Sequence, residues 1–287
     1  MMKIRILLWL VFAWFIAMSV LSCNGQQRYS SPQGYDLNNP VKYFMPDALN
    51  EISGIAFHNG KADSIYAEQD EDGHVYYMKL GDKKAAHSKF EAHGDYEDIA
   101  IMGNEVFVLR SDGQIFTFPF KQVRSGNIKN PFVLGRMLPK GEYESMYAEE
   151  KTKRLYVLCK TCKDNDNKNF VTGHFYTIVD GMPEDKIGLF SINVNDIKAK
   201  SGKNKMSFHP SALAKNLRTN EWYILSSVNK LLVVTDANWK VKAAYSLPSS
   251  LFLQPEGIAF DNQNNLYISN EGDKMTKATV LKFNFKK

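Results

Sequence analysis

The C-terminal part of the chain contains the stretch Gln254-Pro255-Glu256-Gly257-Ile258-Ala259-Phe260-Asp261, in which an acidic residue opens a short apolar run. After a polar turn come two further short apolar runs, at residues 266–271 and 280–285. Short apolar runs separated by Asx- and Gly-rich turns are typical of antiparallel strands. The unit is therefore predicted to consist of three consecutive strands.

The opening of this unit recurs along the chain. The residues that lead each copy are Ser53, Glu97, Glu144, Ser211 and Glu256, at intervals of 44, 47, 67 and 45 residues. A period in the forties, with about four short strands per unit, is typical of a propeller blade. We therefore predict an all-β, five-bladed β-propeller, with six blades as the alternative count.

The two ends of the repeated region are complementary. Residues 41–45 form an isolated apolar strand before the first repeat, and the last repeat stops at its third strand. We expect residues 41–45 to be the outer strand of the final blade, because this closure removes an open sheet edge.

The third repeat is longer than the others and carries the surplus length. In it, residues 189–194 are expected as a regular strand and residues 174–179 as an extra strand or hairpin.

The first 22 residues differ from the rest of the chain. Lys3 and Arg5 precede an apolar run over residues 6–20. Leu21 and Ser22 follow this run and stand directly before Cys23. This pattern is typical of a secretory signal. Because a cysteine directly follows the small residue, it resembles a lipoprotein signal in which Cys23 becomes lipidated; an uncleaved anchor helix is the alternative.

The predicted organisation is a signal peptide (1–22), a flexible tether (23–40) and the propeller (41–287). We expect the protein in the cell envelope, held to the membrane by lipid on Cys23, on the periplasmic or the outer-membrane face.

Composition and charge limit the partners. The chain has 287 residues, of which 44% are hydrophobic and 23% charged, as in a globular protein. Without Lys3 and Arg5 the formal net charge is +3, which is too small to indicate nucleic-acid binding. We expect a monomer.

Three states remain open for Cys159 and Cys162: a disulfide, free thiols, and a redox or metal role. A zinc site needs about four ligands, more than these two cysteines supply.

The leading residues of the repeats are predicted to form a ring, because the first strand of each propeller blade lines the central channel. Residues two positions earlier share the same side of an extended strand. They are Glu51, Asp95, Glu142, His209 and Gln254, so six of the ten positions are carboxylates. Two carboxylates about 6 Å apart repel by roughly 3 kcal/mol at an effective dielectric of about 20. Protonation, pairing with Lys or Arg, or a bound cation must offset this repulsion.

Oxygen ligands favour calcium or magnesium over zinc. Further polar residues follow the second strands of the blades, and we expect some of them at the same channel mouth. The candidates for ligand recognition are Asp95, Glu142, His209, Ser211, Arg110 and Glu271. Nucleophilic catalysis is not indicated, because the sequence contains no Gly-x-Ser-x-Gly, His-Glu-x-x-His or phosphate-binding glycine motif.

Four motifs carry a resemblance to a known family. They are Glu51-Ile52-Ser53-Gly54-Ile55-Ala56, Tyr96-Glu97-Asp98-Ile99-Ala100, Tyr143-Glu144-Ser145-Met146 and Pro255-Glu256-Gly257-Ile258-Ala259-Phe260. Together they resemble the SdiA-regulated family of bacterial envelope proteins, which is distantly related to NHL-repeat propellers. The resemblance implies a five-bladed propeller with a calcium site and a binding role. It implies Glu51, Glu97, Glu144 and Glu256 as metal ligands. The chain departs from a regular pattern at residues 159–179 and at Ser211.

Two functions of different classes follow. The first is a calcium-binding envelope propeller that binds a protein or small molecule without catalysis. The alternative is a metal-dependent hydrolase of the lactonase or phosphoesterase type, in which a channel-bound divalent cation activates water and His209 or Asp95 acts as base.

Overall fold

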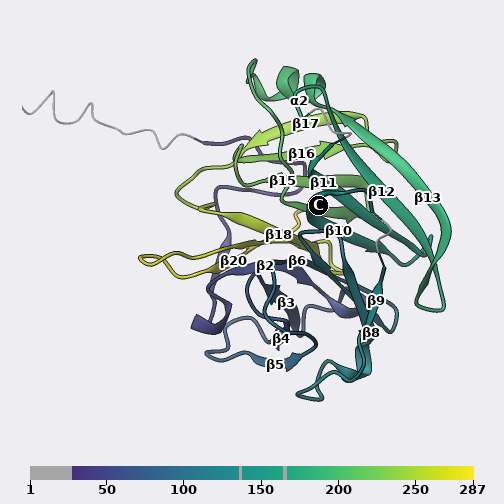
Figure 1. Cartoon of the computed structure of the whole chain (residues 1–287). Helices are drawn as coiled ribbons and strands as arrows, with labels where there is room; N and C mark the ends of the chain where they lie inside the picture. Colours follow the sequence, from purple (N-terminus) through teal and green to yellow (C-terminus); the bar gives the residue numbers. More distant parts are fainter. Residues whose placement is uncertain (1–27, 136–137, 164–166) are drawn as a thin grey trace, which may run out of the picture.

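The computed structural model describes residues 28–135, 138–163 and 167–287. They form five four-stranded antiparallel sheets arranged as blades around a central axis (Figure 1). The strands that begin the sheets lie at the centre, and the last strands lie at the periphery. This confirms the predicted all-β, five-bladed propeller.

Each blade is a meander of consecutive strands, except for the fifth, which includes the first strand of the chain. Blade one contains β2 (Ile52–Ala56), β3 (Ile65–Gln69), β4 (His74–Met78) and β5 (Ala86–Lys89). Blade two contains β6 (Tyr96–Met102), β7 (Glu105–Arg110), β8 (Ile115–Pro119) and β9 (Phe132–Leu134). Blade three contains β10 (Gly141–Glu149), β11 (Arg154–Cys162), β12 (Phe170–Val179) and β13 (Met182–Asn193). Blade four contains β14 (Ala212–Asn216), β15 (Glu221–Ser226), β16 (Leu231–Thr235) and β17 (Val241–Ser246). Blade five contains β18 (Pro255–Phe260), β19 (Leu266–Asn270), β20 (Thr279–Phe283) and β1 (Val41–Phe44).

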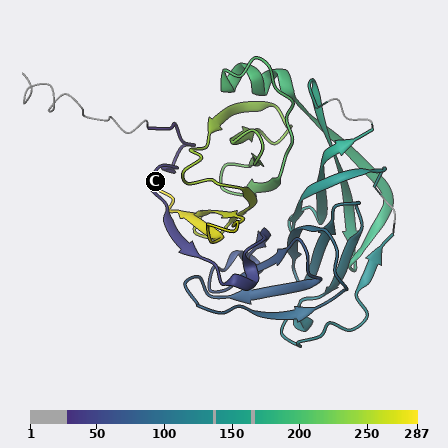
Figure 2. The ribbon, with the colours of Figure 1, turned by 60° about the vertical axis from the view of Figure 1, so that its left-hand side comes forward.

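The ring closes through the N-terminal strand. β1 pairs antiparallel with β20, from Val41 opposite Lys282 to Phe44 opposite Thr279. Figure 2 shows the purple N-terminal segment beside the yellow C-terminal strands. The predicted closure is therefore confirmed.

The core lies between the blades. Side chains alternate across each strand, so both faces of an inner sheet can bury apolar residues against the neighbouring blades. The buried residues form five apolar clusters, one at each of the five interfaces between blades. The interface of blade five with blade one has its own cluster, which includes Tyr267 and Ile55. The ring is thus closed by packing as well as by strand pairing.

Blade three differs from its expected arrangement. Its third and fourth strands are β12 and β13, so residues 174–179 are part of the regular third strand and residues 189–193 belong to the fourth. The surplus length lies in a long β12–β13 hairpin and in the helix α2 (Val194–Ser201). α2 begins at an Asn193 side-chain cap and ends at Gly202, which has a φ of 71°.

Part of the predicted tether packs on the propeller. Leu37 is fully buried and Tyr35 is 7% exposed, both in the cluster between blades four and five. The Tyr35 hydroxyl donates to the Asn264 carbonyl over 2.7 Å. The prediction of a flexible tether over residues 23–40 is therefore wrong for this segment. The predicted signal peptide and Cys23 lie outside the described residues. Within the described part of the chain, no helix has the length and apolar character needed to cross a bilayer.

We predict that Leu37→Ala lowers the free energy of unfolding by about 3 kcal/mol, because it removes a buried side chain and leaves a cavity. Leu217→Ala is the matched control, since Leu217 is 70% exposed, and should change stability little. Chemical denaturation measures both. Equal stabilities of the two variants would show that residues 35–37 do not pack as described.

Candidate functional site

The starts of the inner strands surround an acidic cavity, here called the acidic mouth, of about 610 Å³. Among the residues that the structure describes, seven carboxylates and two lysines line it. The lining residues are Ser53, Asp70, Asp95, Glu97, Glu142, Glu144, Lys160, His209, Ser211, Ser227, Val228, Lys230, Gln254, Glu256 and Glu271.

Three glutamates of the acidic mouth sit at β-bulges. In β6 the pairing steps from Tyr96 to Asp98, which leaves Glu97 as the extra residue. The same shift leaves Glu256 unpaired in β18 and Glu144 unpaired in β10. A bulge redirects the side chain of its extra residue, and here all three residues line the acidic mouth. The local backbone therefore explains why these glutamates, far apart in sequence, face one cavity.

Contacts between neighbouring inner strands hold the bulges in place. The Ser53 hydroxyl donates to the Glu97 carbonyl over 2.9 Å, and the Ser211 hydroxyl donates to the Pro255 carbonyl over 2.8 Å. A Cβ atom on Gly54 would collide with Asp98, and one on Gly257 would collide with the carbonyl of Ser53. Glycine at these positions allows the close approach of the strands.

Two carboxyl groups lie completely within this layer. Asp98 accepts hydrogen bonds from the backbone amides of Ile99, over 2.8 Å, and Met146, over 2.7 Å, and so links blades two and three. Glu68 accepts from the Gly54 amide over 2.6 Å. Burial raises the pKa of both carboxyl groups well above the ordinary value. Both are therefore structural groups, which accept backbone hydrogen bonds between neighbouring strands.

The carboxylates of the mouth are electrostatically strained. Burial, together with the charges of Asp70 and Asp95, raises the pKa of Glu97 to about 9. Burial and the charge of Glu271 raise the pKa of Asp70 to about 8 and that of Glu256 to about 7. Near neutral pH some of these groups therefore retain protons.

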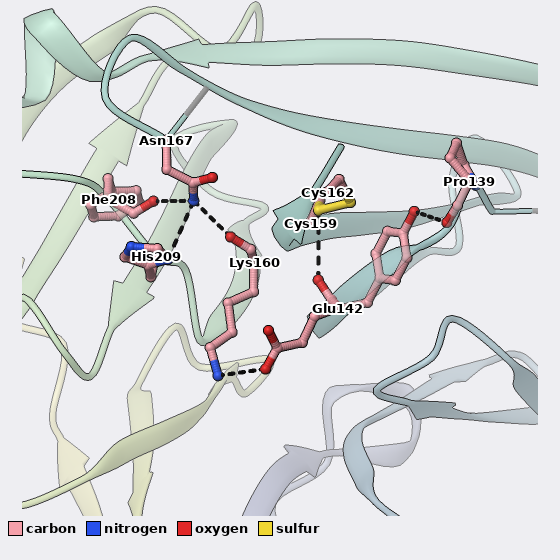
Figure 3. The surroundings of a disulfide bond; sticks show 9 residues. Pro139, Glu142, Cys159, Lys160, Cys162, Asn167, Phe208 and His209 are labelled. Carbon is pink, nitrogen blue, oxygen red and sulfur yellow. Dashed lines mark hydrogen bonds and ion pairs between the residues drawn. A yellow bond between two sulfur atoms is a disulfide. The ribbon is translucent and has the colours of Figure 1, made fainter. Parts of the chain in front are cut away.

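Lys160 partly neutralises one side of the mouth. It is the extra residue of a bulge in β11, where the pairing steps from Cys159 opposite Tyr143 to Thr161 opposite Glu142. Its ammonium group pairs with Glu144. It also lies 3.1 Å from Glu142 Oε1 (Figure 3). Lys160 is therefore an internal counter-ion of the acidic mouth.

A disulfide spans the bulge that presents Lys160. Cys159 and Cys162 are bonded, so the open choice among disulfide, thiols and metal is resolved in favour of the disulfide. A Cβ atom on Gly141 would collide with the Cys162 sulfur, so the opposing strand leaves room for the bond. The Lys160 carbonyl accepts from Asn167 Nδ2 over 2.6 Å, and the same nitrogen donates to the carbonyl of Phe208, beside His209 (Figure 3).

Most of the predicted site residues meet in the mouth. Of the predicted metal ligands, Glu97, Glu144 and Glu256 line it, whereas Glu51 lies outside the lining and acts on Glu271 through its charge. Of the predicted ligand-binding residues, Asp95, Glu142, His209, Ser211 and Glu271 line it.

Arg110 is placed differently, because its guanidinium pairs with Asp112 in its own hairpin over 2.8 Å. Asp70, Lys160 and Ser227 are among the polar residues that follow second strands, and they line the mouth although in sequence they resemble ordinary turn residues. The sequence analysis did not identify Lys230 as a residue of the mouth. The available signal was its position in the turn after β15, the second strand of blade four, where Ser227 also lies.

The donor set suits a hard cation, but the side chains do not form a ready-made cage. Among the described residues, no three His, Cys, Asp or Glu side chains come close enough together to hold a metal ion as they are placed. The glutamate oxygens fit calcium by their chemistry. Coordination by three of them requires their side chains to move closer to one another.

These features define a class: a five-bladed β-propeller with an acidic channel mouth. Within that class, residues 177–275 match the model of the SdiA-regulated family, which confirms the expected resemblance over this segment. No curated protein matches the chain.

Two solved structures share the fold. A luciferin-regenerating enzyme is 11% identical, with 86% of this chain and 95% of that chain covered and a TM-score of 0.53. The glutaminyl cyclase of Myxococcus xanthus is 15% identical, with 86% and 98% covered and a TM-score of 0.53. At these identities the likeness concerns the fold alone.

We predict that, in buffer without divalent cations, the melting temperature falls as the pH rises from about 5 to about 9. A carboxyl whose pKa is raised in the folded state contributes stability at low pH, which is lost as the pH rises through its folded pKa. Glu97 stays protonated to a pH of about 9 in the folded protein but ionises near 4.5 when unfolded.

Glu97→Gln should flatten this decline, because the amide is neutral throughout. Glu150→Gln alters an exposed glutamate, 57% accessible, and should keep the parental profile. Thermal melts across the pH range test both. A parental slope in Glu97→Gln would contradict the assignment.

We predict that Cys159→Ser with Cys162→Ser lowers the free energy of unfolding by about 2 kcal/mol, as expected for a bond closing a loop of this size. Denaturation of the oxidised parent, the reduced parent and the double variant measures this. The reduced parent should match the variant, and reductant should not affect the variant. Three coincident curves would show that the disulfide does not constrain the chain.

Proposed function

We propose that this protein is a binding module of the cell envelope, attached to the membrane by lipid on Cys23, whose acidic mouth takes up calcium. The observation that carries the proposal is the convergence of three bulged glutamates, Glu97, Glu144 and Glu256, on one mouth. A bound calcium ion would supply the positive charge that offsets their mutual repulsion. Lys160 supplies part of this charge at Glu144.

The surroundings of the mouth support recognition of a further partner, a protein or a small molecule. Asp95, Glu142, His209 and Glu271 place acceptors and an imidazole around the opening. Val228 is 71% exposed at its edge, where an apolar contact can form. Function as a binding module requires no reaction in the mouth.

We predict that calcium raises the melting temperature, and more at pH 8 than at pH 6, because ligand carboxylates must lose their protons. At about 100 times the Kd, the stabilisation is about 2.7 kcal/mol, or roughly 5–10 °C. Glu97→Gln with Glu256→Gln should remove the shift. Glu51→Gln is the matched control, since Glu51 lies outside the lining, and should retain it.

Differential scanning calorimetry with and without calcium provides the measurement. If millimolar calcium leaves the parental melting temperature unchanged at pH 8, the calcium proposal fails. If Glu51→Gln loses the response while the double variant keeps it, the assignment of the ligands fails.

A second candidate is a metal-dependent hydrolase, and one observation favours it. His209 and Asp95, either of which can act as a general base, line the same mouth as the three bulged glutamates. Calcium-dependent hydrolysis of a lactone or phosphoester that is abolished in His209→Ala would identify the mouth as an active site. Saturable calcium binding without turnover supports the binding module.

A further inference from the structure

The central channel has a second cavity, here called the apolar cavity, at the opposite ends of the inner strands. Its volume is about 720 Å³, compared with about 610 Å³ for the acidic mouth. The acidic mouth is lined by residues at the starts of the inner strands, such as Glu97 and Glu256, whereas the apolar cavity is lined by residues near the ends of the same strands. The two cavities therefore open toward opposite faces of the propeller.

The interior of this cavity is mainly apolar, and among the described residues its one acidic group on an inner strand is Asp98, whose pKa is raised well above the ordinary value by burial. Each blade contributes one alanine, Ala56, Ala100, Ala148, Ala214 and Ala259, and at least one larger aliphatic or methionine side chain. The five alanines leave the space at the axis that larger side chains would fill. Ligand-binding cavities of about 300–1,000 Å³ are typically lined by apolar side chains with a few polar groups. The apolar cavity has the size and lining of such a site.

The rim adds charge to this apolar interior. Lys215 pairs with Glu149 over 2.5 Å, and Glu150 pairs with Lys153. Arg218 instead lies over the ring of Phe285, with 4.9 Å between its Cζ and the ring centroid. A guanidinium that lies over a ring face still has its in-plane N–H donors available to a carboxylate.

A second acidic residue of the rim is likewise engaged within the protein. Asp261 accepts hydrogen bonds from the amides of Gln263 and Asn265, the side chain of Asn265 and the hydroxyl of Tyr267. Next to Arg218, Leu217 is 70% exposed at the rim. The rim therefore presents a cation and an apolar side chain together above an apolar interior.

We propose that the apolar cavity binds a small amphiphile with an aliphatic body and a carboxylate head, as in a medium-chain fatty acid. The aliphatic body occupies the space bounded by the alanines, and the carboxylate meets Arg218 at the rim. This site is separate from the acidic mouth and does not depend on calcium binding there.

Calorimetric titration of the purified protein with dodecanoate, decanoate and octanoate tests the proposal. We expect saturable one-to-one binding that weakens about fourfold for each methylene removed, as expected for burial of the chain. Dodecanol and dodecylammonium should bind at least tenfold more weakly than dodecanoate. Absence of saturable dodecanoate binding, or equal affinity for dodecanol, overturns the proposal.

Variants assign the binding to this cavity. Arg218→Gln should weaken dodecanoate binding about tenfold and leave dodecanol binding unchanged, and Leu217→Asp should weaken both. Val228→Asp is the matched control, because Val228 is 71% exposed and lies at the acidic mouth, and it should retain parental affinity. Ala148→Leu fills the cavity and should abolish binding, with the melting temperature reporting its fold. Loss of binding in Val228→Asp, or parental binding in both Leu217→Asp and Arg218→Gln, overturns the location.

Discussion

The structure depends on the close approach of five inner strands at one axis. Backbones of neighbouring blades come within hydrogen-bonding range of side chains, as where the Ser53 hydroxyl reaches the Glu97 carbonyl and Asp98 reaches the Met146 amide. Such proximity requires glycine at Gly54 and Gly257, because a Cβ atom at either position would overlap the neighbouring strand. The five apolar clusters between the blades supply the favourable burial that holds the ring together.

This framework gathers groups that repel one another. The bulges present Glu97, Glu144 and Glu256 to one cavity, and partial burial prevents water from screening them fully. The raised pKa values of Glu97 and Glu256 show that their ionised forms are disfavoured in the mouth. The pairing of Lys160 with Glu144 offsets part of the repulsion between the carboxylates. Strain of this kind clusters at functional sites, where a ligand completes the balance of charge.

The same strands give the two ends of the channel opposite chemistry. In each inner strand that carries a bulged glutamate, the glutamate lies near the start of the strand and an alanine lies near its end. One face of the propeller therefore presents charge, and the other presents an apolar cavity. Propellers of one fold carry many unrelated functions, and the solved structures similar to this chain share its fold at low identity. The chemistry of each end, rather than the fold, therefore carries the functional argument.

The sequence by itself determined the repeat, the blade count and the closing strand. These features depend on local alternation and on spacing, which an isolated sequence displays directly. It also indicated the acidic ring, because glutamates led three of the repeats. Only the tertiary structure decided that these glutamates lie at bulges, that Glu51 and Arg110 fall outside the mouth, and that Asp70 and Lys160 belong to it. The side chains of Tyr35 and Leu37 likewise found their partners only in the folded protein. The reason is physical: a bulge, an ion pair or a buried contact depends on the neighbouring strand, which comes from a distant part of the chain.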